Sequence, residues 1–503
     1  MILLAIIIVP FAGGLIAWAT LPLGRTISRW ICIIALVFEL VCILYVWSVS
    51  RDPALLVPGH WLAELKLPWI PQIGASWHFA LDGISLLLVG LTAFLGILAV
   101  VASWNTIQEK SGFFHFNLMW TISAVIGVFM AVDLFVFYVF WELMLVPIYF
   151  IIALWGHEQR GPAASKFFIF TQISGLFMLL SILGLYFIHG SATGSYTFDY
   201  SALLNTILTK RAAAWLMAGF FFAFAVKLGI VPFHGWLPDA YVQAPAAGSL
   251  LLAGTMAKTG AYGLIRFVVP LFSSAAFSFS TAGMVLGVVT ILYGAALAWV
   301  QPDLKRLIAY SSISHMGFVM LGIFVWGSLS LQGVIIQMIS HGIGVAALFM
   351  IAGSLFERTH SRQLDRFGGL WGSAPRMGGA TMVFALAAMG LPGLGNFVGE
   401  FLILLNASRI SIPITAVAMA GGVLSVIYAL WLVQRVFQGP ALTERCSDFS
   451  DRELAALSST IVLIVAIGIF PQLLLDTSAP AVRSLMHLTA HGGSPRPAGG
   501  PVP

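Results

Sequence analysis

Six ionisable side chains lie inside long apolar stretches of this sequence, and each is of a type that can carry a proton. They are two glutamates, two lysines and two histidines: Glu142, Lys227, Lys258, His315, His341 and Glu400. A charged side chain at the centre of a bilayer costs about 2.5–3.5 kcal/mol on insertion scales, so it needs a partner or water. Histidine both donates and accepts a proton near neutral pH, which suits a relay between amino and carboxyl groups. These residues predict a row of proton-transfer sites within a membrane.

Each of these side chains also has a simpler, structural interpretation. A lone buried lysine can be held in a fixed ion pair, and a lone buried histidine is often a hydrogen-bonded core residue. Glu39 fits a structural role because no helix break lies near it. In the same interpretation, Glu400 would only neutralise a nearby base such as Arg409 or Arg435. We favour the proton row because two lysines on neighbouring spans both need a neutralising partner and few acids are available.

Three of these sites have a proline on the same span: Glu142 and Lys227 each lie five residues before one, and Glu400 lies two turns after one in a glycine-rich stretch. The pairs are Glu142 with Pro147, Lys227 with Pro232, and Glu400 with Pro392. Proline removes one helical hydrogen bond and displaces the carbonyl four residues before it. The freed carbonyl gives water or a charged group a polar contact at mid-depth, and broken helices of this kind are a device of ion transporters. We therefore predict that the spans containing Lys227 and Glu400 are broken helices.

The composition indicates a membrane protein. Of 503 residues, 60% are hydrophobic and 9% are charged, whereas a soluble chain has about 25% charged residues. This excludes a soluble enzyme and a disordered or fibrous chain, and no basic run is dense enough to bind nucleic acid. The three cysteines form no CxxC pair, and there is no Walker loop, HExxH motif or strand-to-helix GxGxxG. We expect no cofactor or metal on this chain.

The apolar stretches are long enough to cross a bilayer, which takes about 20 helical residues. There are fourteen: 2–20, 28–49, 79–103, 113–131, 134–154, 166–189, 213–231, 245–269, 277–301, 306–326, 331–356, 376–406, 411–437 and 453–475. They are continuously apolar, which excludes a strand barrel. The first is no secretory signal, because its positive residues, Arg25 and Arg29, follow it. The expected fold class is an all-α polytopic membrane protein.

The basic residues set the expected orientation. Loops after odd-numbered spans hold 14 of them and the other loops hold 8, so both termini should lie outside. The outside segment 50–78 is rich in Trp and Pro, and we expect an ordered loop along the interface. Lys305 and Arg306 are expected to anchor the inner end of a span and to help close an inner water path. The tail from Gly492 is expected to be disordered.

Two spans that stand five apart share a local pattern. The Phe-Ala pair at 224–225 precedes Pro232 at the same spacing as the pair at 384–385 precedes Pro392. Repeats with an odd number of spans are inverted in the membrane. We predict two inverted five-helix repeats within four parts of the chain: 1–110 with spans 1–3, 111–270 with spans 4–8, 271–440 with spans 9–13, and 441–503 with the last span and a flexible tail.

Four longer motifs connect the chain to a known family. They are FYVFWELMLVPIYF (137–150), VPFHGWLPDAYVQAPAAGS (231–249), KRLIAYSSISHMGF (305–318) and LPGLGNFVGEF (391–401). The chain resembles the antiporter-like membrane subunits of respiratory complex I and of multisubunit cation/proton antiporters. The resemblance extends over all fourteen spans.

This resemblance implies a proton channel of two half-channels joined by a central polar axis. It assigns the six residues in order: Glu142 and Lys227 as the pair of the first half, Lys258 as the bridge, His315 and His341 as the relay, and Glu400 as the distal outlet. The supporting positions are Asp133, Pro147, Pro232, His234, Asp239, Lys305 and Pro392. Tyr241 departs from the family, since many relatives carry histidine there.

The resemblance also implies a function. The chain would be a proton-translocating membrane subunit of a respiratory NADH–quinone oxidoreductase in the bacterial inner membrane, driven by quinone reduction elsewhere in the complex. FMN, iron–sulfur clusters and quinone would be held by partner subunits. The expected partners are neighbouring antiporter-like subunits, the NADH-oxidising arm indirectly, and lipids. Two alternatives stay open: a cation/proton antiporter subunit without a redox partner, and a structural membrane scaffold.

Overall fold

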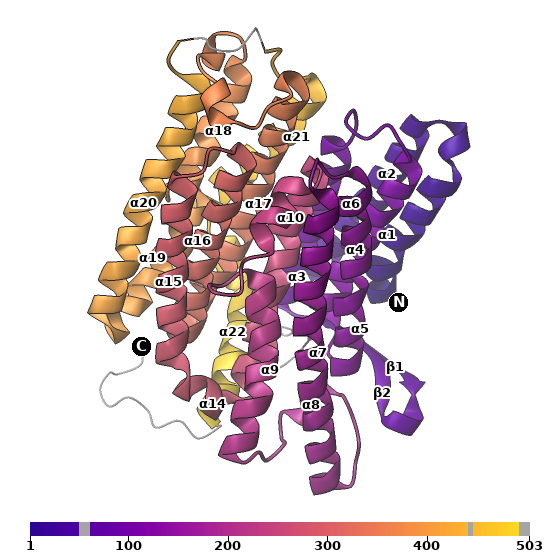
Figure 1. Cartoon of the computed structure of the whole chain (residues 1–503). Coiled ribbons are helices and arrows are strands. Elements are labelled where there is room, and N and C mark those ends of the chain that lie inside the picture. The colour runs from indigo at the N-terminus through magenta and orange to yellow at the C-terminus, as the bar shows by residue number, and fades with distance from the viewer. Residues whose placement is uncertain (50–60, 441–445, 492–503) are drawn as a thin grey trace.

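The computed structural model describes residues 1–49, 61–440 and 446–491. Most of its helices run side by side along one axis and form an elongated bundle (Figure 1). Within these ranges, twelve helical segments are long and apolar enough to cross a membrane: α1 (Ile2–Ala19), α2 (Arg25–Val49), α3 (Gly83–Ala102), α4 (Ser111–Met130), α5 (Leu134–Leu143) together with α6 (Leu145–Trp155), α7 (Arg160–Thr193), α9 (Lys210–Leu228), α15 (Ser280–Trp299), α16 (Leu304–Phe324), α17 (Ser328–Thr359), α20 (Ile412–Phe437) and α21 (Asp451–Ile469). The prediction of an all-α polytopic membrane protein is confirmed.

The two remaining predicted spans, 245–269 and 376–406, fall on interrupted helices. The first is a rod of five consecutive segments: α11 (Ala246–Leu251), η4 (Leu252–Met256), α12 (Ala257–Gly263), η5 (Leu264–Val268) and α13 (Val269–Leu271). Both η4 and η5 are π-helical. The second consists of α18 (Pro375–Ala388) and α19 (Gly395–Ile410). Each of the fourteen predicted stretches therefore overlaps a helical segment.

The predicted helix breaks are present. In the span that contains Lys227, α9 ends at Leu228, residues 229–236 form turns, and the chain resumes as α10 (Leu237–Gln243). Gly229 ends α9 with a φ of +79°, a conformation that glycine adopts without steric cost. In the span that contains Glu400, residues 389–394 separate α18 from α19, and we call them the span-twelve bend. The Glu142 span is interrupted at Met144.

A β-hairpin occupies part of the segment for which the sequence predicted only a loop. Strands β1 (Ala63–Ile70) and β2 (Ala75–Leu81) pair antiparallel around the short turn η3 (Pro71–Ile73). The indoles of Trp69 and Trp77 stack with ring centroids 4.2 Å apart, which explains part of the tryptophan enrichment. The rest of the expected loop, residues 50–60, lies outside the described residues.

A further helix, α22 (Gln472–His491), follows the last span and was not predicted. Its polar and apolar residues form separate faces, and it packs against α3 and α17. The Trp47 indole donates to the Thr477 hydroxyl over 3.0 Å, and the Thr477 carbonyl lies against Gly83, where a side chain would not fit. The predicted disordered tail from Gly492 lies outside the described residues. Short helical turns complete the fold: η1 (Leu21–Leu23), α8 (Tyr200–Leu203), α14 (Ser273–Ser278), η6 (Leu364–Arg366) and η7 (Leu370–Gly372).

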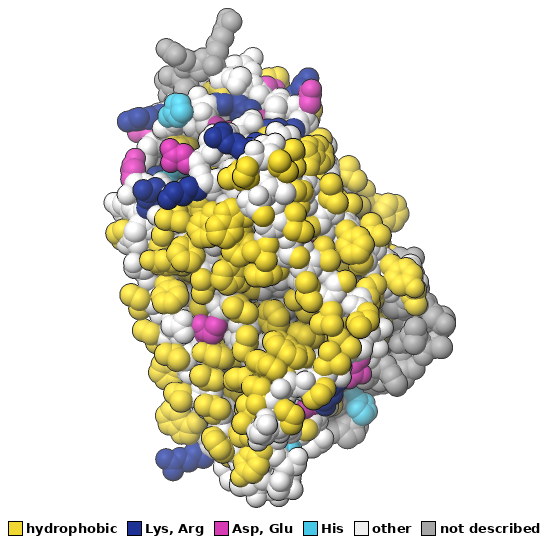
Figure 2. Space-filling model, turned by 90° about the vertical axis from the view of Figure 1, so that its right-hand side faces the viewer, with side chains coloured by type: hydrophobic (Ala, Val, Ile, Leu, Met, Phe, Trp, Pro, Cys, Tyr) yellow, Lys and Arg dark blue, Asp and Glu magenta, His cyan; other side chains and the backbone are white. Residues whose placement is uncertain are grey.

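The surface has the pattern of a membrane protein. Figure 2 shows apolar side chains covering a broad band of one face, with charged side chains gathered mainly beyond it at one end of the molecule. We call this the basic end; the loops there carry Arg25, Lys110, Arg160, Arg358 and Arg376. The opposite end carries the β-hairpin, and we call it the hairpin end (Figure 1).

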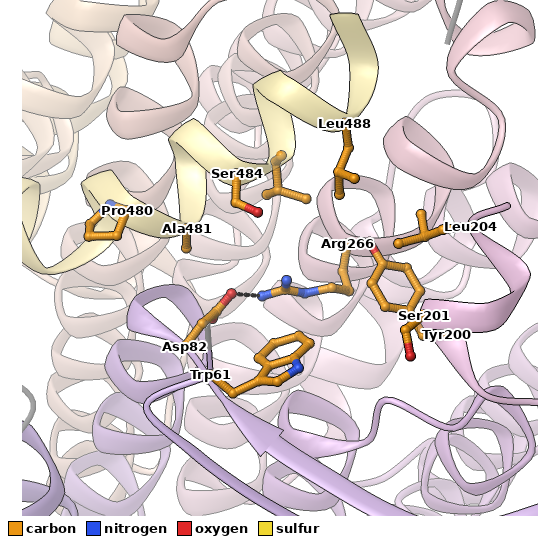
Figure 3. A pocket seen from close by; sticks show the side chains of 11 residues that line it. Trp61, Asp82, Tyr200, Ser201, Leu204, Arg266, Pro480, Ala481, Ser484 and Leu488 are labelled. Atoms are coloured by element: carbon orange, nitrogen blue, oxygen red, sulfur yellow. Dashed lines mark hydrogen bonds and ion pairs between the residues drawn. The ribbon is translucent and has the colours of Figure 1, made fainter. Parts of the chain in front are cut away.

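A pocket of about 180 Å³ lies at the hairpin end, between α22 and the start of β1. Figure 3 shows Arg266 extended across it, with its guanidinium directed at Asp82 and the Trp61 indole below. Asp82 pairs with Arg266 through one oxygen and caps α3 through the other, which accepts from the backbone of Ser85 over 2.9 Å. This ion pair joins the start of α3 to η5 at the hairpin end.

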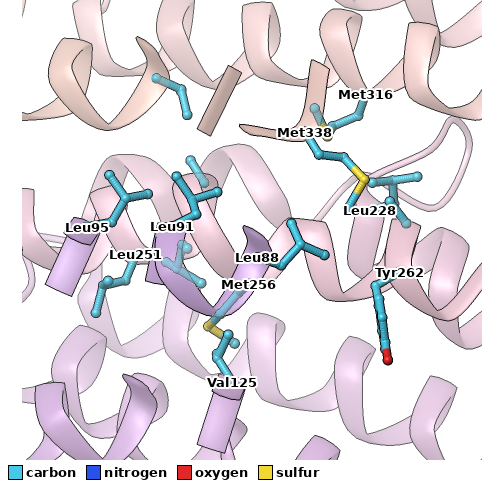
Figure 4. Packing of buried hydrophobic residues seen from close by; sticks show 14 of the residues in the cluster. Leu88, Leu91, Leu95, Val125, Leu228, Leu251, Met256, Tyr262, Met316 and Met338 are labelled. Carbon is cyan, nitrogen blue, oxygen red and sulfur yellow. The ribbon is translucent and has the colours of Figure 1, made fainter. Parts of the chain in front are cut away.

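The bundle core is closely packed and consists mainly of buried hydrophobic side chains. Figure 4 shows leucines of α3, among them Leu88, Leu91 and Leu95, against Leu251 and Met256 of the rod formed by the segments from α11 to α13. Helix α17 is the innermost span, since every residue of its most apolar window is buried. Polar groups carried by α17 are thus kept from bulk water and must find partners within the protein.

Candidate functional site

The ammonium group of Lys258 forms two hydrogen bonds in the bundle core. It is fully buried on α12, immediately after the π-helical segment η4. Its ammonium donates to the Ala253 carbonyl over 2.6 Å and to Nδ1 of His341 over 2.8 Å. A π-helical turn displaces carbonyls from the ordinary i to i+4 pattern, which makes such an acceptor available. The local helix distortion therefore supplies the polar contact that a lysine at this depth requires.

The two histidines face each other without a direct hydrogen bond. The ring centroids of His315 on α16 and His341 on α17 are 5.3 Å apart. A cavity of about 10 Å³ lies beside them, lined also by Ser311 and Asn396. Nε2 of His341 and Oδ1 of Asn396 have no hydrogen-bond partner among the described residues. A cavity of about this size holds one water molecule, which would join these polar atoms.

Glu400 ends this series of contacts on α19. Its Oε1 accepts from Nδ1 of His315 over 2.8 Å and from the Gln337 amide over 2.8 Å. The other imidazole nitrogen of His315 lies 3.4 Å from the Tyr428 hydroxyl on α20. Lys258, His341, His315 and Glu400 thus follow one another from α12 to α19, and we call them the second-half row.

Gln337 and Tyr428 are site residues that the sequence analysis missed. Gln337 lies one helical turn before His341 on α17, so it shares the face that carries the histidine. A neutral amide and a phenol inside an apolar span carry no charge signal. The periodicity around His341 was the available clue to Gln337.

The structural interpretation of Glu400 is wrong in one respect. Among the ion pairs of the described residues, none joins Glu400 to Arg409 or Arg435, and its ionisable partner is His315. The guanidinium of Arg435 instead lies 5.6 Å from the centre of the Trp431 ring.

Lys227 is in a different environment. Its side chain lies at the end of α9 and is 1% exposed, and its ammonium has no hydrogen-bond partner within the described part of the chain. The nearest aromatic groups are Trp141, at 5.1 Å from the ring centroid, and Phe167, at 5.9 Å. Such contacts attract a cation through the ring quadrupole, by about 2 kcal/mol when the site is desolvated.

Glu142 and Lys227 interact without a direct ion pair. No ion pair within 4.0 Å links them among the described residues, although the two charges act on one another. Glu142 is only partly buried and faces α7, where a side chain on Gly175 would collide with Oε1. We call Glu142 and Lys227 the first-half pair because Trp141, next to Glu142, lies against the lysine.

Two of the supporting residues predicted from the sequence, Asp133 and His234, lie in different environments. Asp133 caps α5, accepting from the Phe135 and Val136 amides, and also accepts from the Ser76 amide over 2.9 Å, which makes it structural. His234 lies in the turns of the Lys227 span; its Nδ1 has no hydrogen-bond partner among the residues that the structure describes, and its ring lies 5.1 Å from that of Tyr293.

Asp239 and Lys305 hold the end of α10 at the basic end of the molecule. Asp239 pairs with Lys166 at 2.7 Å and with Arg306 at 3.0 Å. Lys305 is 1% exposed and donates to the Ala244 carbonyl over 2.7 Å. Arg306 is therefore accessible, as expected of a surface anchor, whereas Lys305 is buried within the protein. Together these contacts close the bundle between α10 and α16.

Tyr241, the departure from the family, is fully buried on α10. Its hydroxyl donates to the carbonyl of Leu252, over 3.2 Å, at the start of the π-helical segment η4. The side chain thus links α10 to the rod that carries Lys258. Pro147, Pro232 and Pro392 accompany the three interruptions described above.

A second polar cluster lies outside the spans, at the hairpin end. His78 is hydrogen-bonded to Asp199 and to Glu64, each over 2.8 Å, and Lys66 donates to Asp199 over 2.6 Å. Burial alone disfavours the imidazolium, but the two carboxylates outweigh it and raise the pKa of His78 above its ordinary value. Burial disfavours the Asp199 carboxylate, yet its hydrogen bonds to His78 and Lys66 keep the pKa of Asp199 well below the ordinary value.

The described residues contain no group of three His, Cys, Asp or Glu side chains placed to hold a metal ion. The ionisable groups of the second-half row are arranged as hydrogen-bond donors and acceptors, a geometry that fits transfer of protons between neighbours.

Comparisons with known proteins identify the family of the chain. A family described as "NADH:quinone oxidoreductase/Mrp antiporter, TM" matches residues 131–427. The chain is 48% identical to NADH-quinone oxidoreductase subunit M of Pseudomonas aeruginosa, over 96% of this chain and 97% of the relative. It is 47% identical to the subunit M of Escherichia coli, again over 96% of this chain and 97% of that one.

Solved structures share the fold. A chain of respiratory complex I from Thermus thermophilus with bound NADH matches with a TM-score of 0.88 at 30% identity, covering 97% of this chain and 100% of that chain. A chain of the Mrp complex from Dietzia sp. matches with a TM-score of 0.83 at 21% identity, covering 97% and 99%, and supports the fold alone. With nearly half of its residues identical over almost its whole length, the chain belongs to the NADH-quinone oxidoreductase subunit M family, the antiporter-like multi-pass membrane subunits of bacterial complex I.

Proposed function

We propose that this chain translocates protons across the membrane, through the first-half pair and the second-half row, while quinone is reduced elsewhere in the complex. The observation that carries the proposal is the series of 2.8 Å contacts that joins Lys258 to His341 and His315 to Glu400 in the bundle core. Every member of the row can take up and release a proton. A purely structural scaffold does not require four such groups in sequence, since each costs desolvation energy.

Transfer along the row follows from the donors and acceptors. Lys258 gives a proton to Nδ1 of His341, whose Nε2–H then faces the small cavity beside His315. Imidazole takes a proton at one nitrogen and releases another from the second, so the charge moves without displacement of the ring. Nδ1 of His315 next donates to Oε1 of Glu400. One bridging water between the histidines completes this path.

The step from Lys227 to Lys258 needs a rearrangement. The Lys227 ammonium is surrounded by aromatic rings and has no partner within the described residues, whereas Lys258 is already held by two acceptors. A change in the charge of Glu142 would alter the energy of Lys227 across a low-dielectric gap. Glu142 is only partly buried in the isolated chain, so a neighbouring antiporter-like subunit at this surface could change its charge. We propose that the energy released by quinone reduction reaches this subunit through a change in the charge of Glu142.

We further propose that both termini and the hairpin end lie on the periplasmic side of the bacterial inner membrane. The excess of basic residues at the opposite end supports this orientation. Position 362 lies in the loop at the basic end. A cysteine placed there should react with an impermeant thiol reagent only after the membrane is opened, and labelling from the periplasm would reverse the orientation.

Lys258→Ala tests the function in the assembled complex. We expect quinone reduction to continue more slowly and the protons pumped per quinone to fall, because the row loses its first donor. Lys210→Ala is the matched control, since Lys210 is exposed at the hairpin end. Normal pumping by an assembled Lys258→Ala complex would rule out the row as the proton path.

A further inference from the structure

The two oxygens of Glu400 have different surroundings. Oε1 accepts two hydrogen bonds, one from Gln337 and one from His315. A carboxyl oxygen that already accepts two N–H groups is poorly placed to carry the proton itself, because a hydroxyl there would meet both donors. When Glu400 holds a proton, that proton therefore resides on Oε2.

Oε2 faces the span-twelve bend at Gly390. A side-chain Cβ on Gly390 would lie 3.2 Å from Oε2, which is closer than ordinary carbon contacts. Gly390 is itself partly exposed, and residues 391–393 are exposed on the surface of the chain. The Glu400 side chain is 11% exposed, while that of its partner His315 is 3% exposed. The carboxyl group is thus reached from the bend and not from the histidine side.

We propose that Glu400 exchanges its proton with water through the gap left by the missing side chain of Gly390, and that Gln337 positions the carboxyl group for this exchange. The proposal rests on the proposed function and identifies the place where the second-half row exchanges protons with water. Gln337 holds Oε1 toward the row, and the absence of a Cβ at Gly390 leaves Oε2 accessible to water in the bend.

The transfer balances as follows. Once His315 carries a proton on both ring nitrogens, its N–H bond at Nδ1 breaks and that proton joins Oε1, which leaves a neutral imidazole, while the O–H bond at Oε2 breaks and its proton passes to water. The carboxyl group stays neutral, and one proton has crossed it. Rotation about the Cγ–Cδ bond, a broad two-fold torsion, then restores the first arrangement.

The chain provides a matched pair of glycines to test the gap. Gly390 and Gly393 lie in the same bend with φ of +73° and +94°, so alanine strains the backbone at either position. A Cβ on Gly393 meets nothing within 4 Å, whereas one on Gly390 meets Oε2. Gly390→Ala therefore adds a contact with the carboxyl group that Gly393→Ala lacks.

The experiment uses the assembled complex in sealed vesicles and records hydrogen–deuterium exchange of the protonated Glu400 carboxyl band by infrared difference spectroscopy. Glu400→Gln identifies the band. We expect exchange in Gly390→Ala to slow by about tenfold or more, as when a reacting group is displaced by a fraction of an ångström, and pumping to fall with it. Gly393→Ala should keep the wild-type exchange rate.

The outcomes distinguish a failure of the proposed gap at Gly390 from a failure of the proposed proton path along the second-half row. Equal slowing in both glycine variants would assign the effect to backbone strain and overturn the proposal. Normal exchange in Gly390→Ala would also overturn it. If Glu400→Gln itself pumps normally, the proposed function fails instead. Should Gly390→Ala not assemble, Gly390→Asn and Gly393→Asn repeat the comparison, because asparagine tolerates positive φ and still carries a Cβ.

Gln337→Met tests the positioning role. Methionine keeps the volume and removes the N–H donor to Oε1, so the proton is no longer confined to Oε2. We expect the carboxyl band of Glu400 to shift and broaden, and Gln337→Glu, which can donate when protonated, to restore the band at low pH. A band unchanged in Gln337→Met would show that Gln337 only fills space.

Discussion

The two halves of the proposed path hold their lysines in opposite ways. Lys258 is as deeply buried as Lys227, yet it donates to a carbonyl and to an imidazole, while the Lys227 ammonium lies against aromatic rings and has no hydrogen-bond partner among the described residues. A buried ammonium without hydrogen bonds loses several kcal/mol of solvation, and cation–π contacts return about 2 kcal/mol of it. The charge on Lys258 is therefore compensated by two hydrogen bonds, whereas the charge on Lys227 is compensated by aromatic rings and by the more distant Glu142.

This contrast suggests where an external signal has the most effect. A site whose charged form is barely compensated changes its protonation when a nearby charge changes. A site with satisfied hydrogen bonds passes protons on without large changes in energy. The first-half pair therefore suits coupling to a partner subunit, and the second-half row suits conduction.

The largest expected effect comes from removing either member of the first-half pair. Lys227→Met or Glu142→Gln should reduce pumping through this subunit to below about a tenth of wild type, because the coupled charge change is lost. The double variant should be no worse than either single variant, since both residues serve one step. Proton uptake per quinone reduced, measured in assembled complexes, checks this, and near-normal pumping by either variant would contradict it.

Glu400 gives the next largest effect, at the far end of the second-half row. Glu400→Gln should abolish most pumping, and Glu400→Asp should retain a good part because the carboxyl group survives. Glu400→Lys should perform poorly, since a loaded lysine is positive where a loaded glutamate is neutral, and His315 and Gln337 both offer N–H groups to this position. If Gln matched wild type while Asp did not, packing and not proton transfer would explain the site.

Stability should separate the two lysines more sharply than activity does. Lys258→Met leaves the Ala253 carbonyl and a histidine nitrogen unpartnered, which should cost about 1–3 kcal/mol. Lys227→Met fills a similar volume and removes an ammonium that has no hydrogen bonds, so we expect no loss and even a small gain. Thermal denaturation of the detergent-solubilised complex measures both. Equal destabilisation would mean that Lys227 has a partner comparable to that of Lys258.

The smallest effect concerns the hairpin-end cluster, which belongs to neither half. The pKa of His78 is raised in the folded protein, so its stabilisation is present below the unfolded value of about 6.5 and is lost as pH rises through the folded value. The pKa of Asp199 is lowered, so its contribution persists until strongly acidic pH. Hydrogen exchange of β1 and β2, corrected for intrinsic rates, should quicken as the pH rises above about 6.5.

His78→Gln should remove most of that pH dependence and leave pumping near the wild-type value. Glu142→Gln is the reciprocal control, because it should affect pumping and leave exchange of the hairpin unchanged. A loss of pumping in His78→Gln would mean that the hairpin end takes part in the proton path.

The sequence by itself determined the spans and the candidate residues, for a physical reason that is local. Twenty consecutive apolar residues define a span whatever surrounds them, and an ionisable group within such a span is costly wherever the helix packs. Proline and glycine act on their own backbone, so the interruptions beside Glu142, Lys227 and Glu400 could also be located in advance. The hairpin and α22 escaped because neither carries a span-length apolar signal.

Only the tertiary structure decided which of those residues touch. Lys258 and His341 are 83 positions apart, and their contact depends on how α12 and α17 are rotated against one another. The same packing put Gln337 beside Glu400, left the first-half pair without a direct bond, and buried Lys305. Neutral groups such as Gln337 and Tyr428 cost too little in a hydropathy pattern to stand out, and the π-helical turn before Lys258 is fixed by its neighbours. A charged residue within an apolar stretch can be recognised from the sequence, but its hydrogen-bond partners are determined by how the helices pack in the tertiary structure.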